Sequence, residues 1–289
     1  MNAAEPIATD LPPLRIGGRS LLPIVQGGMG VGISAHRLAG AVARLNAVGT
    51  IASVDLRRHH PDLMAATGTA RDKAAIERAN RVALDREIRA ALAAAGGRGL
   101  IAVNVMRAVG QYADYVRQSC ESGAHAIVAG AGLPLDLPEL AAAFPAVALV
   151  PILSDARGVG IVLKKWQRRN RLPDAIVIEH PRHAGGHLGA ARIEDLADPR
   201  FEFARVLEET FALLARLGLE RERIPLVVAG GIASPEAVRA AFALGVAAVQ
   251  VGTPFAVTLE GDAHPEFKRV LAEARPEDIV EFTNVAGLP

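Results

Sequence analysis

Two short apolar runs decide the fold of this chain: Pro225-Leu226-Val227-Val228-Ala229-Gly230-Gly231-Ile232 and Ala247-Ala248-Val249-Gln250-Val251-Gly252-Thr253-Pro254. Each run is too short for a helix and leads into glycine. The segment between them opens with Ser234-Pro235-Glu236, a favourable start for a helix. The pattern therefore predicts a strand–loop–helix–strand unit. Because both strands are apolar on both faces, we expect them in a parallel sheet that is covered on each side.

The glycines that end these two runs predict an anion-binding site. Because they have no side chain, Gly230, Gly231 and Gly252 allow backbone N–H groups to close on an anion. One such turn alone would indicate only a tight change of direction. Two matched turns, one strand–helix unit apart, favour phosphate binding, because the loops after strands seven and eight commonly bind phosphate in (β/α)8 barrels.

Working outward from these runs, short apolar segments alternate with helical patterns along the chain. The six earlier strands are predicted at residues 21–28, 49–54, 99–106, 126–132, 147–154 and 175–179. Eight strands that alternate with helices predict an α/β fold, a single (β/α)8 TIM barrel over residues 14–260. An extended loop follows strand six, and residues 261–289 are predicted as a short C-terminal helical extension packed on the barrel. A doubly wound sheet is the alternative, but it would carry its phosphate-binding glycines after the first strand.

Two helix starts are assigned from residues that favour capping. Ser34 is predicted to cap a helix that runs to Leu45. Thr69 and Asp72 form a capping-box pattern for a long helix that runs to Ala95. The segment 57–60, Arg-Arg-His-His, is predicted as a solvated loop.

Charge and cysteine content exclude several classes of protein. The formal net charge of +1 gives no electrostatic reason to expect nucleic acid or an acidic membrane surface as a partner. Cys120 is the only cysteine, so no intramolecular disulfide can form, which fits a reducing cytoplasm. The sequence has neither a signal-peptide pattern nor an apolar run of about 18 residues. We therefore expect a soluble, cytoplasmic protein that contacts no membrane.

The loop after predicted strand six concentrates groups that can do chemistry. It reads His180-Pro181-Arg182-His183-Ala184-Gly185-Gly186-His187-Leu188-Gly189. An imidazole exchanges protons near neutral pH, and glycines let the backbone approach a ligand. His187, which lies among glycines at the C-terminal end of a barrel strand, is the first candidate for a catalytic residue, and His183 is the next. We predict no metal site, because the glycines oppose a helix and no carboxylate or thiol completes a ligand set.

Two amide side chains lie in otherwise apolar strands. Asn104 and Gln250 must find hydrogen-bond partners, either in the barrel wall or in a ligand with alternating donors and acceptors, and the sequence leaves both readings open. Gln26-Gly27-Gly28-Met29 ends the first strand without a charge, which suits a flat ring laid over the backbone.

Four motifs together resemble a known family. They are Pro23-Ile24-Val25-Gln26-Gly27-Gly28-Met29, Ala184-Gly185-Gly186-His187-Leu188-Gly189, Ala229-Gly230-Gly231-Ile232 and Gln250-Val251-Gly252-Thr253. The chain resembles the nitronate monooxygenase (2-nitropropane dioxygenase-like) flavoproteins. Their superfamily includes flavin-dependent enoyl-ACP reductases and NADH:quinone reductases. The motifs occur in order over nearly the whole chain.

The resemblance implies FMN as cofactor and assigns roles to individual residues. Its phosphate would lie on Gly230, Gly231, Gly252 and Thr253, and its ring near Gln26, Gly27, Gly28, Met29 and Asn104. Gly185, Gly186 and Gln250 are the remaining candidates for cofactor contacts. FMN is favoured over FAD because no GxGxxG turn for a pyrophosphate follows the first strand. The active-site histidine would be His187.

The same resemblance implies oxidation of an alkyl nitronate with O2, although the motifs do not separate the members of the group. One alternative is an NAD(P)H-dependent flavin reductase of the enoyl-ACP or quinone type. The other is a non-catalytic barrel that binds FMN or a phosphorylated metabolite. The use of NAD(P)H and assembly into a homodimer stay open.

Three departures from the pattern of the family bear on the substrate. His183 stands where a glutamate is common, and Pro254 where an arginine is common. Some quinone-reducing relatives carry a lysine at the end of strand five, whereas Ile152-Leu153-Ser154 offers no cation there.

Overall fold

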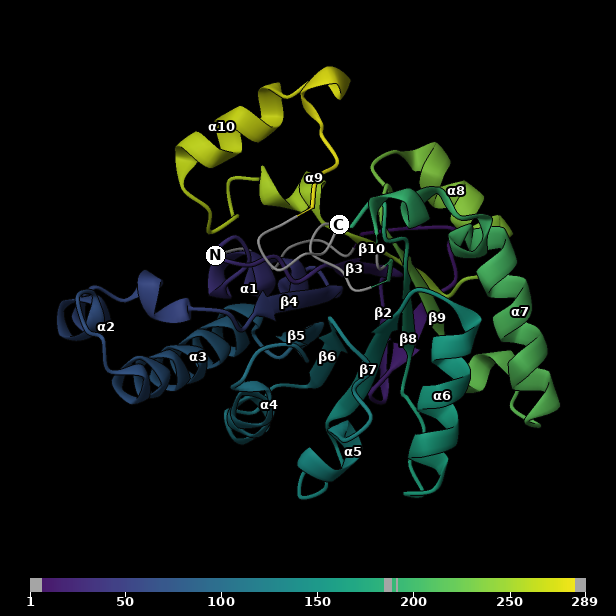
Figure 1. Cartoon of the computed structure of the whole chain (residues 1–289), viewed down its shortest axis with the longest axis horizontal. Coiled ribbons are helices and arrows are strands. Elements are labelled where there is room, and N and C mark those ends of the chain that lie inside the picture. Colours follow the sequence, from purple (N-terminus) through teal and green to yellow (C-terminus); the bar gives the residue numbers. More distant parts are fainter. Residues whose placement is uncertain (1–6, 185–188, 191, 284–289) are drawn as a thin grey trace.

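The computed structural model describes residues 7–184, 189–190 and 192–283. Eight parallel strands form a closed barrel in the order β10-β3-β4-β5-β6-β7-β8-β9 (Figure 1). Their bounds are β3 Ile24–Gln26, β4 Val48–Ala52, β5 Leu100–Met106, β6 Ala126–Gly130, β7 Ala148–Leu153, β8 Ile176–Glu179, β9 Leu226–Ala229 and β10 Ala248–Val251. The predicted TIM barrel is confirmed, and β9 and β10 are neighbours in it.

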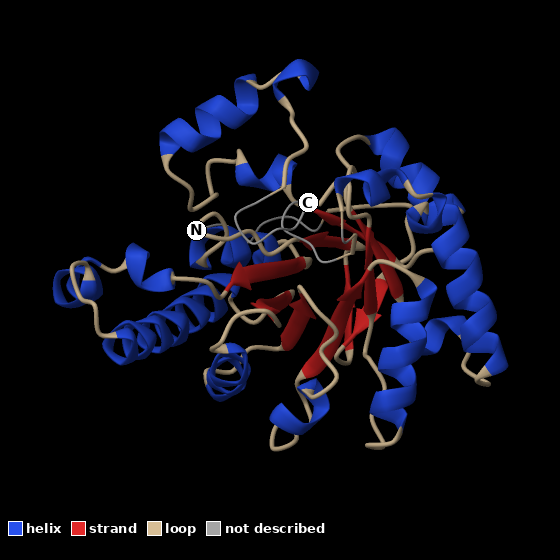
Figure 2. Ribbon diagram, viewed as in Figure 1, coloured by secondary structure: helices blue, strands red, loops and turns tan. Residues whose placement is uncertain are grey.

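Helices follow the strands and cover the outside of the barrel, as Figure 2 shows. They are α1 His36–Arg44, α3 Lys73–Ala95, α4 Tyr112–Glu121, α5 Leu137–Leu140, α6 Ala156–Gln167, α7 Phe203–Arg216 and α8 Pro235–Ala243. Shorter helical segments are η1 Leu56–His59, α2 Pro61–Thr67, η2 Ile193–Ala197, η3 Pro199–Phe201 and η4 Arg221–Arg223. The extended loop after β8 contains η2 and η3.

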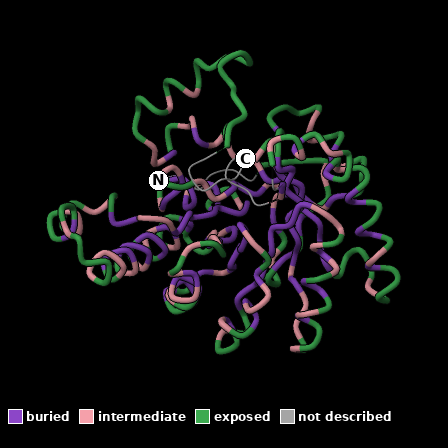
Figure 3. Tube along the Cα trace, viewed as in Figure 1, coloured by how far each residue is buried: buried purple, intermediate pink, exposed green. Residues whose placement is uncertain are grey.

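The core has two layers, because the barrel wall is buried on both sides (Figure 3). Small side chains such as Ala102, Val128 and Ala148 fill the barrel interior. Larger ones, including Ile127 and Trp166, pack between the strands and the helices. At Gly49 the backbone of α1 comes so close that an added Cβ would lie 1.9 Å from the carbonyl oxygen of Ala39, so only glycine fits there.

A β-hairpin closes the N-terminal end of the barrel. Its strands, β1 Leu14–Ile16 and β2 Arg19–Leu21, are antiparallel, and its buried side chains join the interior cluster. The single strand predicted over residues 21–28 was therefore wrong in extent, since Leu21 belongs to the hairpin and β3 begins at Ile24. Gly17 and Gly18 make the turn with φ angles of 56° and 71°, where glycine is favoured.

The segment between β4 and α3 also differs from the prediction. Helix α2 occupies part of it, and α3 is capped by Asp72, whose Oδ1 accepts a hydrogen bond from the N–H of Ala74 at 2.9 Å. The predicted capping box at Thr69 was wrong, because that residue lies in the turn after α2. The predicted solvated loop was also wrong: Arg57 is buried, and its guanidinium lies 3.0 Å from Asp55.

The C-terminal extension contains α9 Thr253–Ala256, α10 Pro265–Glu273 and η5 Pro276–Asp278. None of the residues of α10 is buried, and Figure 1 shows this helix beyond α9, away from the barrel strands. Polar contacts tie the extension to the rest of the chain, among them Asp262 to the start of α1 and Arg182 to Glu281 at 2.7 Å. No helix in the described part of the chain has both the length and the apolar character to cross a membrane.

Candidate active site at the C-terminal ends of the barrel strands

Gln26, at the end of β3, uses its side chain to join two strands. Its Oε1 accepts a hydrogen bond from the N–H of Thr50 at 2.8 Å, and its Nε2 donates to the carbonyl oxygen of Thr50 at 3.1 Å. Only one residue pair, Val25 with Val48, aligns β3 with β4. The side-chain amide therefore extends the pairing of these two strands. Because it is used in this way, a ligand can contact only the backbone groups that follow Gln26.

The backbone of Gly27 and Gly28 lies between two amide side chains. A Cβ on Gly27 would come within 3.3 Å of Gln250, and one on Gly28 within 2.4 Å of the Cβ of Asn104. Gln250 is 9% exposed and Asn104 is half-buried. Neither side chain has a hydrogen-bond partner among the described residues. A side-chain amide can both donate and accept, so these two are available to a ligand at the barrel mouth.

Met29 connects this loop to the end of β10. It packs beside Phe255 against the cluster of Leu38, Val42 and Ala47, and a Cβ on Gly252 would lie 3.6 Å from its sulfur atom. The structure thus brings the residues predicted at the end of the first strand close to those predicted after the eighth.

The glycines after β9 and β10 lie side by side. Ala229 pairs with Gln250, so Gly230 and Gly252 follow neighbouring strands to the same end of the barrel. Gly230 and Gly231 have φ angles of 105° and 73°. Consecutive residues of this kind can turn their N–H groups to one side, the arrangement that binds anions. Thr253 is exposed at the start of α9.

His183 lies against these glycines. A Cβ on Gly231 would be 3.3 Å from the imidazole Cγ, and one on Gly230 would be 3.2 Å from the Cβ of His183. The His183 ring is 4.8 Å from the ring of His180, measured between centroids. The structure therefore places His183 beside the predicted phosphate site and not beside Asn104.

His180 is buried at the end of β8, edge-on to Phe203. Burial, with His183 and Arg182 nearby, lowers the pKa of His180, so the neutral imidazole is favoured. Its Nδ1 lies 3.3 Å from the N–H of Arg182 and accepts that hydrogen bond. Sequence reasoning placed this residue after His187, and its contacts are those of a structural residue.

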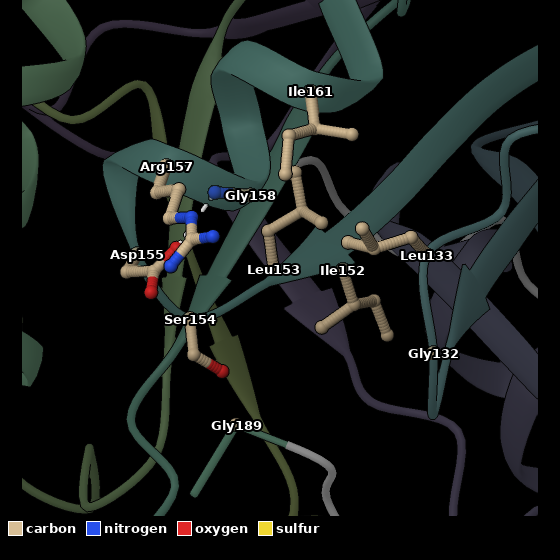
Figure 4. A pocket seen from close by; sticks show the side chains of 10 residues that line it. All are labelled: Gly132, Leu133, Ile152, Leu153, Ser154, Asp155, Arg157, Gly158, Ile161 and Gly189. Atoms are coloured by element: carbon tan, nitrogen blue, oxygen red, sulfur yellow. Dashed lines mark hydrogen bonds between the residues drawn. The ribbon is translucent and has the colours of Figure 1, made fainter.

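A cavity of about 240 Å³ opens beside the end of β7 (Figure 4). Four aliphatic side chains form much of its wall: Leu133, Ile152, Leu153 and Ile161. The hydroxyl of Ser154, which is buried without a hydrogen-bond partner, and the guanidinium of Arg157 are its polar groups, and Asp155 caps α6 through the N–H of Gly158 at 2.7 Å. Sequence reasoning missed this cavity. Ser154, at the end of a strand, was the only local signal.

The remaining predicted residues, Gly185, Gly186 and His187, lie outside the described residues. Among the residues that are described, no group of three or more His, Cys, Asp or Glu side chains has an arrangement that could hold a metal ion.

The family comparison covers nearly the whole chain. The model of a family described as nitronate monooxygenase matches residues 19–289. The chain is similar to a probable nitronate monooxygenase of Bacillus subtilis, with 29% identity over 112 residues, or 39% of this chain and 30% of that protein. It is 36% identical to the nitronate monooxygenase of Pseudomonas aeruginosa over 102 residues, or 35% of this chain and 26% of that protein. These alignments span less than a third of each relative.

Two solved structures share the fold. FabK from Thermotoga maritima superposes with a TM-score of 0.60 at 22% identity, over 87% of this chain and 64% of that one. Nitroalkane oxidase from Streptomyces ansochromogenes gives a TM-score of 0.59 at 20% identity, over 86% and 70%. At these identities the similarity shows the fold alone.

Proposed function

The chain belongs to the nitronate monooxygenase family, and from this membership we propose that it is an FMN-dependent oxidoreductase that oxidises alkyl nitronates with O2. The observation that carries the proposal is the pair of unpartnered amides, Asn104 and Gln250, beside the Gly27–Gly28 backbone. A flavin ring presents alternating donors and acceptors along one edge, which suits two such amides.

The glycine turns fit the other end of FMN. Backbone N–H groups of Gly230, Gly231 and Gly252 would hold its phosphate, with the hydroxyl of Thr253 beside them. The exposed imidazole of His183 adds a group that can donate a hydrogen bond at this end. Gly185 and Gly186 stay predicted cofactor contacts. FMN supplies the electron acceptor when bound, and the protein supplies its position and the proton transfer.

His187 is the proposed catalytic histidine. A nitronate is already an anion, whereas a neutral nitroalkane must first lose an α-proton. An imidazole can accept that proton, and as an imidazolium it can hold the charge of the nitronate. His183 is less suited to this role, because it lies at the phosphate end of the site.

The cavity beside β7 is the proposed space for the alkyl group of the substrate. Its aliphatic walls suit a hydrocarbon chain.

Two measurements test the proposal together: oxygen consumption, and reduction of the flavin under anaerobic conditions. We expect oxygen consumption with alkyl nitronates in the absence of pyridine nucleotide, and FMN released from the purified protein by heat. Rapid anaerobic reduction of the flavin by NADH or NADPH, without nitronate turnover, would instead identify a reductase of the enoyl-ACP or quinone type. Bound FMN with neither activity would identify a non-catalytic barrel.

A further inference from the structure

Helix α1 is capped by carboxylates from distant parts of the chain. Its N-cap residue, Ala35, has no side-chain oxygen to offer. Asp262 accepts hydrogen bonds from the N–H groups of Ala35 and Leu38, at 2.9 and 3.1 Å. Glu87 of α3 accepts one from the N–H of His36 at 2.8 Å. Both carboxylates also suit the positive end of the helix dipole.

Glu87 is buried between two histidines. Its side chain is 2% exposed, with His36 Nδ1 at 2.7 Å from Oε2 and His60 Nε2 at 3.0 Å from Oε1. A carboxylate buried this deeply requires partners that compensate for lost hydration. The hydrogen bond with Glu87 raises the pKa of His36. Burial opposes ionisation of Glu87, but its hydrogen bonds with His36 lower its pKa.

The start of α1 is connected directly to the loop over residues 27–35. Ser34 was predicted to cap α1, and this was wrong: its hydroxyl accepts a hydrogen bond from the N–H of Met29 at 2.8 Å. The N–H of Ser34 in turn donates to the carbonyl oxygen of Met29 at 3.0 Å. Fixing His36 therefore also fixes Met29 and the glycines before it.

The ring of His59 supports the same loop from the other side. Gly32 has a φ of 70°, and a Cβ on it would lie 2.8 Å from His59 Nε2. The charged and titratable groups around the carboxylate are thus His36, His59 and His60, with Asp262 and Arg37 near the start of α1.

We propose that Glu87 is a positioning residue for the cofactor loop, residues 27–35: its buried carboxylate, hydrogen-bonded to the backbone and imidazole of His36, fixes this loop in the conformation that receives the flavin ring. The identification of the ligand as FMN rests on the proposed function, whereas the positioning of the loop does not. Within the described residues the cluster does not have the geometry of a metal site.

The ion pair makes the position of the loop depend on pH. The contribution of His36 is complete below its ordinary pKa of 6.5 and is lost as the pH rises through the raised value. The contribution of Glu87 is complete above its ordinary pKa of 4.5 and is lost as the pH falls through the lowered value. The loop is therefore held best in mildly acidic solution and less well in alkaline solution.

Titration of FMN fluorescence against the purified protein, from about pH 6 to about pH 8, tests this inference. We expect the wild type to bind FMN more weakly as the pH rises. At the acid end, Glu87→Gln should bind roughly tenfold more weakly, the effect of a lost charged hydrogen bond, and its affinity should change less with pH than that of the wild type. Asp85→Asn is the matched control, because Asp85 lies on the same helix and pairs with Arg89 on the surface. It should behave as the wild type.

Hydrogen exchange of the FMN-free protein gives a readout that does not depend on the ligand. The amides of residues 29–38 should exchange faster in Glu87→Gln and at alkaline pH, after correction for the intrinsic rate, but not in Asp85→Asn. If Glu87→Gln does not fold, His36→Asn and the pH series of the wild type decide, because His36→Asn removes the cation and keeps the Glu87 carboxylate.

Unchanged exchange of these amides in the variants and across the pH series would overturn the positioning role. A wild type that takes up no FMN at any pH would defeat the proposed function instead, and the exchange data would still decide the role of Glu87.

Discussion

The imidazole of His183 lies against the backbone of Gly231, so that a Cβ on the glycine would come within 3.3 Å of the ring. This contact joins the loop after β8 to the turn after β9. It also means that a change at Gly231 acts on two parts of the proposed phosphate site together.

Gly231→Ala should abolish most of the FMN binding. Its φ of 73° costs an alanine about 1–2 kcal/mol, and the added methyl group meets His183. Gly218→Ala is a close control, because its φ is 69° and nothing lies within 4 Å of the added Cβ. Both variants should lose thermal stability because of the positive φ, but only Gly231→Ala should lose FMN affinity in a fluorescence titration. Equal affinities would remove the glycine turn from the site.

Substitutions at Gln26 and Asn104 should separate the effects on stability from those on cofactor binding. Gln26→Ala leaves the N–H and carbonyl groups of Thr50 without their partners, which should cost about 3 kcal/mol in the free energy of unfolding. Asn104→Ala breaks no side-chain hydrogen bond within the described residues and should unfold at nearly the wild-type denaturant concentration. FMN affinity should nevertheless fall in Asn104→Ala. Retention of full affinity would show that this amide does not contact the ring.

His187→Asn should distinguish proton transfer from cofactor binding. We expect FMN to stay bound, and turnover of a neutral nitroalkane to fall by about 10²–10⁴-fold, the usual contribution of a general base. Turnover of a preformed nitronate should fall less, because its proton has already left. Steady-state oxygen consumption with both substrates measures the difference. A parallel loss on both, together with loss of FMN, would indicate a packing role.

Leu133→Phe should narrow the range of substrates. The larger ring would fill part of the cavity beside β7, so kcat/KM should fall several-fold for longer alkyl nitronates and little for the smallest one. Leu217→Phe is the control, since Leu217 is 40% exposed and Leu133 is 37% exposed, but Leu217 lies at the end of α7. If the preference for chain length is the same in both variants, the alkyl group binds elsewhere.

The barrel could be predicted because its signals are local. Apolar runs such as Leu226–Ala229 and the glycines after them indicate a strand and its turn without knowledge of any distant residue. Because strands and helices alternate along the chain, two successive strands are expected to be neighbours in the barrel. Gly230 and Gly252, which follow two such strands, are therefore expected to lie close together.

What could not be predicted depends on contacts between distant residues. Ser34 has the right chemistry for a helix cap, but Asp262 takes that place from 227 residues away along the chain. From the sequence alone, the side chain of Gln26 could contact either a ligand or Thr50. The choice depends on where Thr50 lies in the folded barrel. The cavity beside β7 arises because Leu133, Ser154 and Ile161 converge from two loops and a helix.

Closure of the barrel through Ile24 and Val249 sets the order of events during synthesis. Strand β3 is the first of the eight barrel strands to leave the ribosome, and its partner β10 is the last. One edge of the nascent sheet therefore stays open until β10 is made, and an open edge can pair with other chains. We infer that the yield of folded protein in a producing cell depends on chaperones that shield this edge and on the speed of elongation toward the C-terminal end.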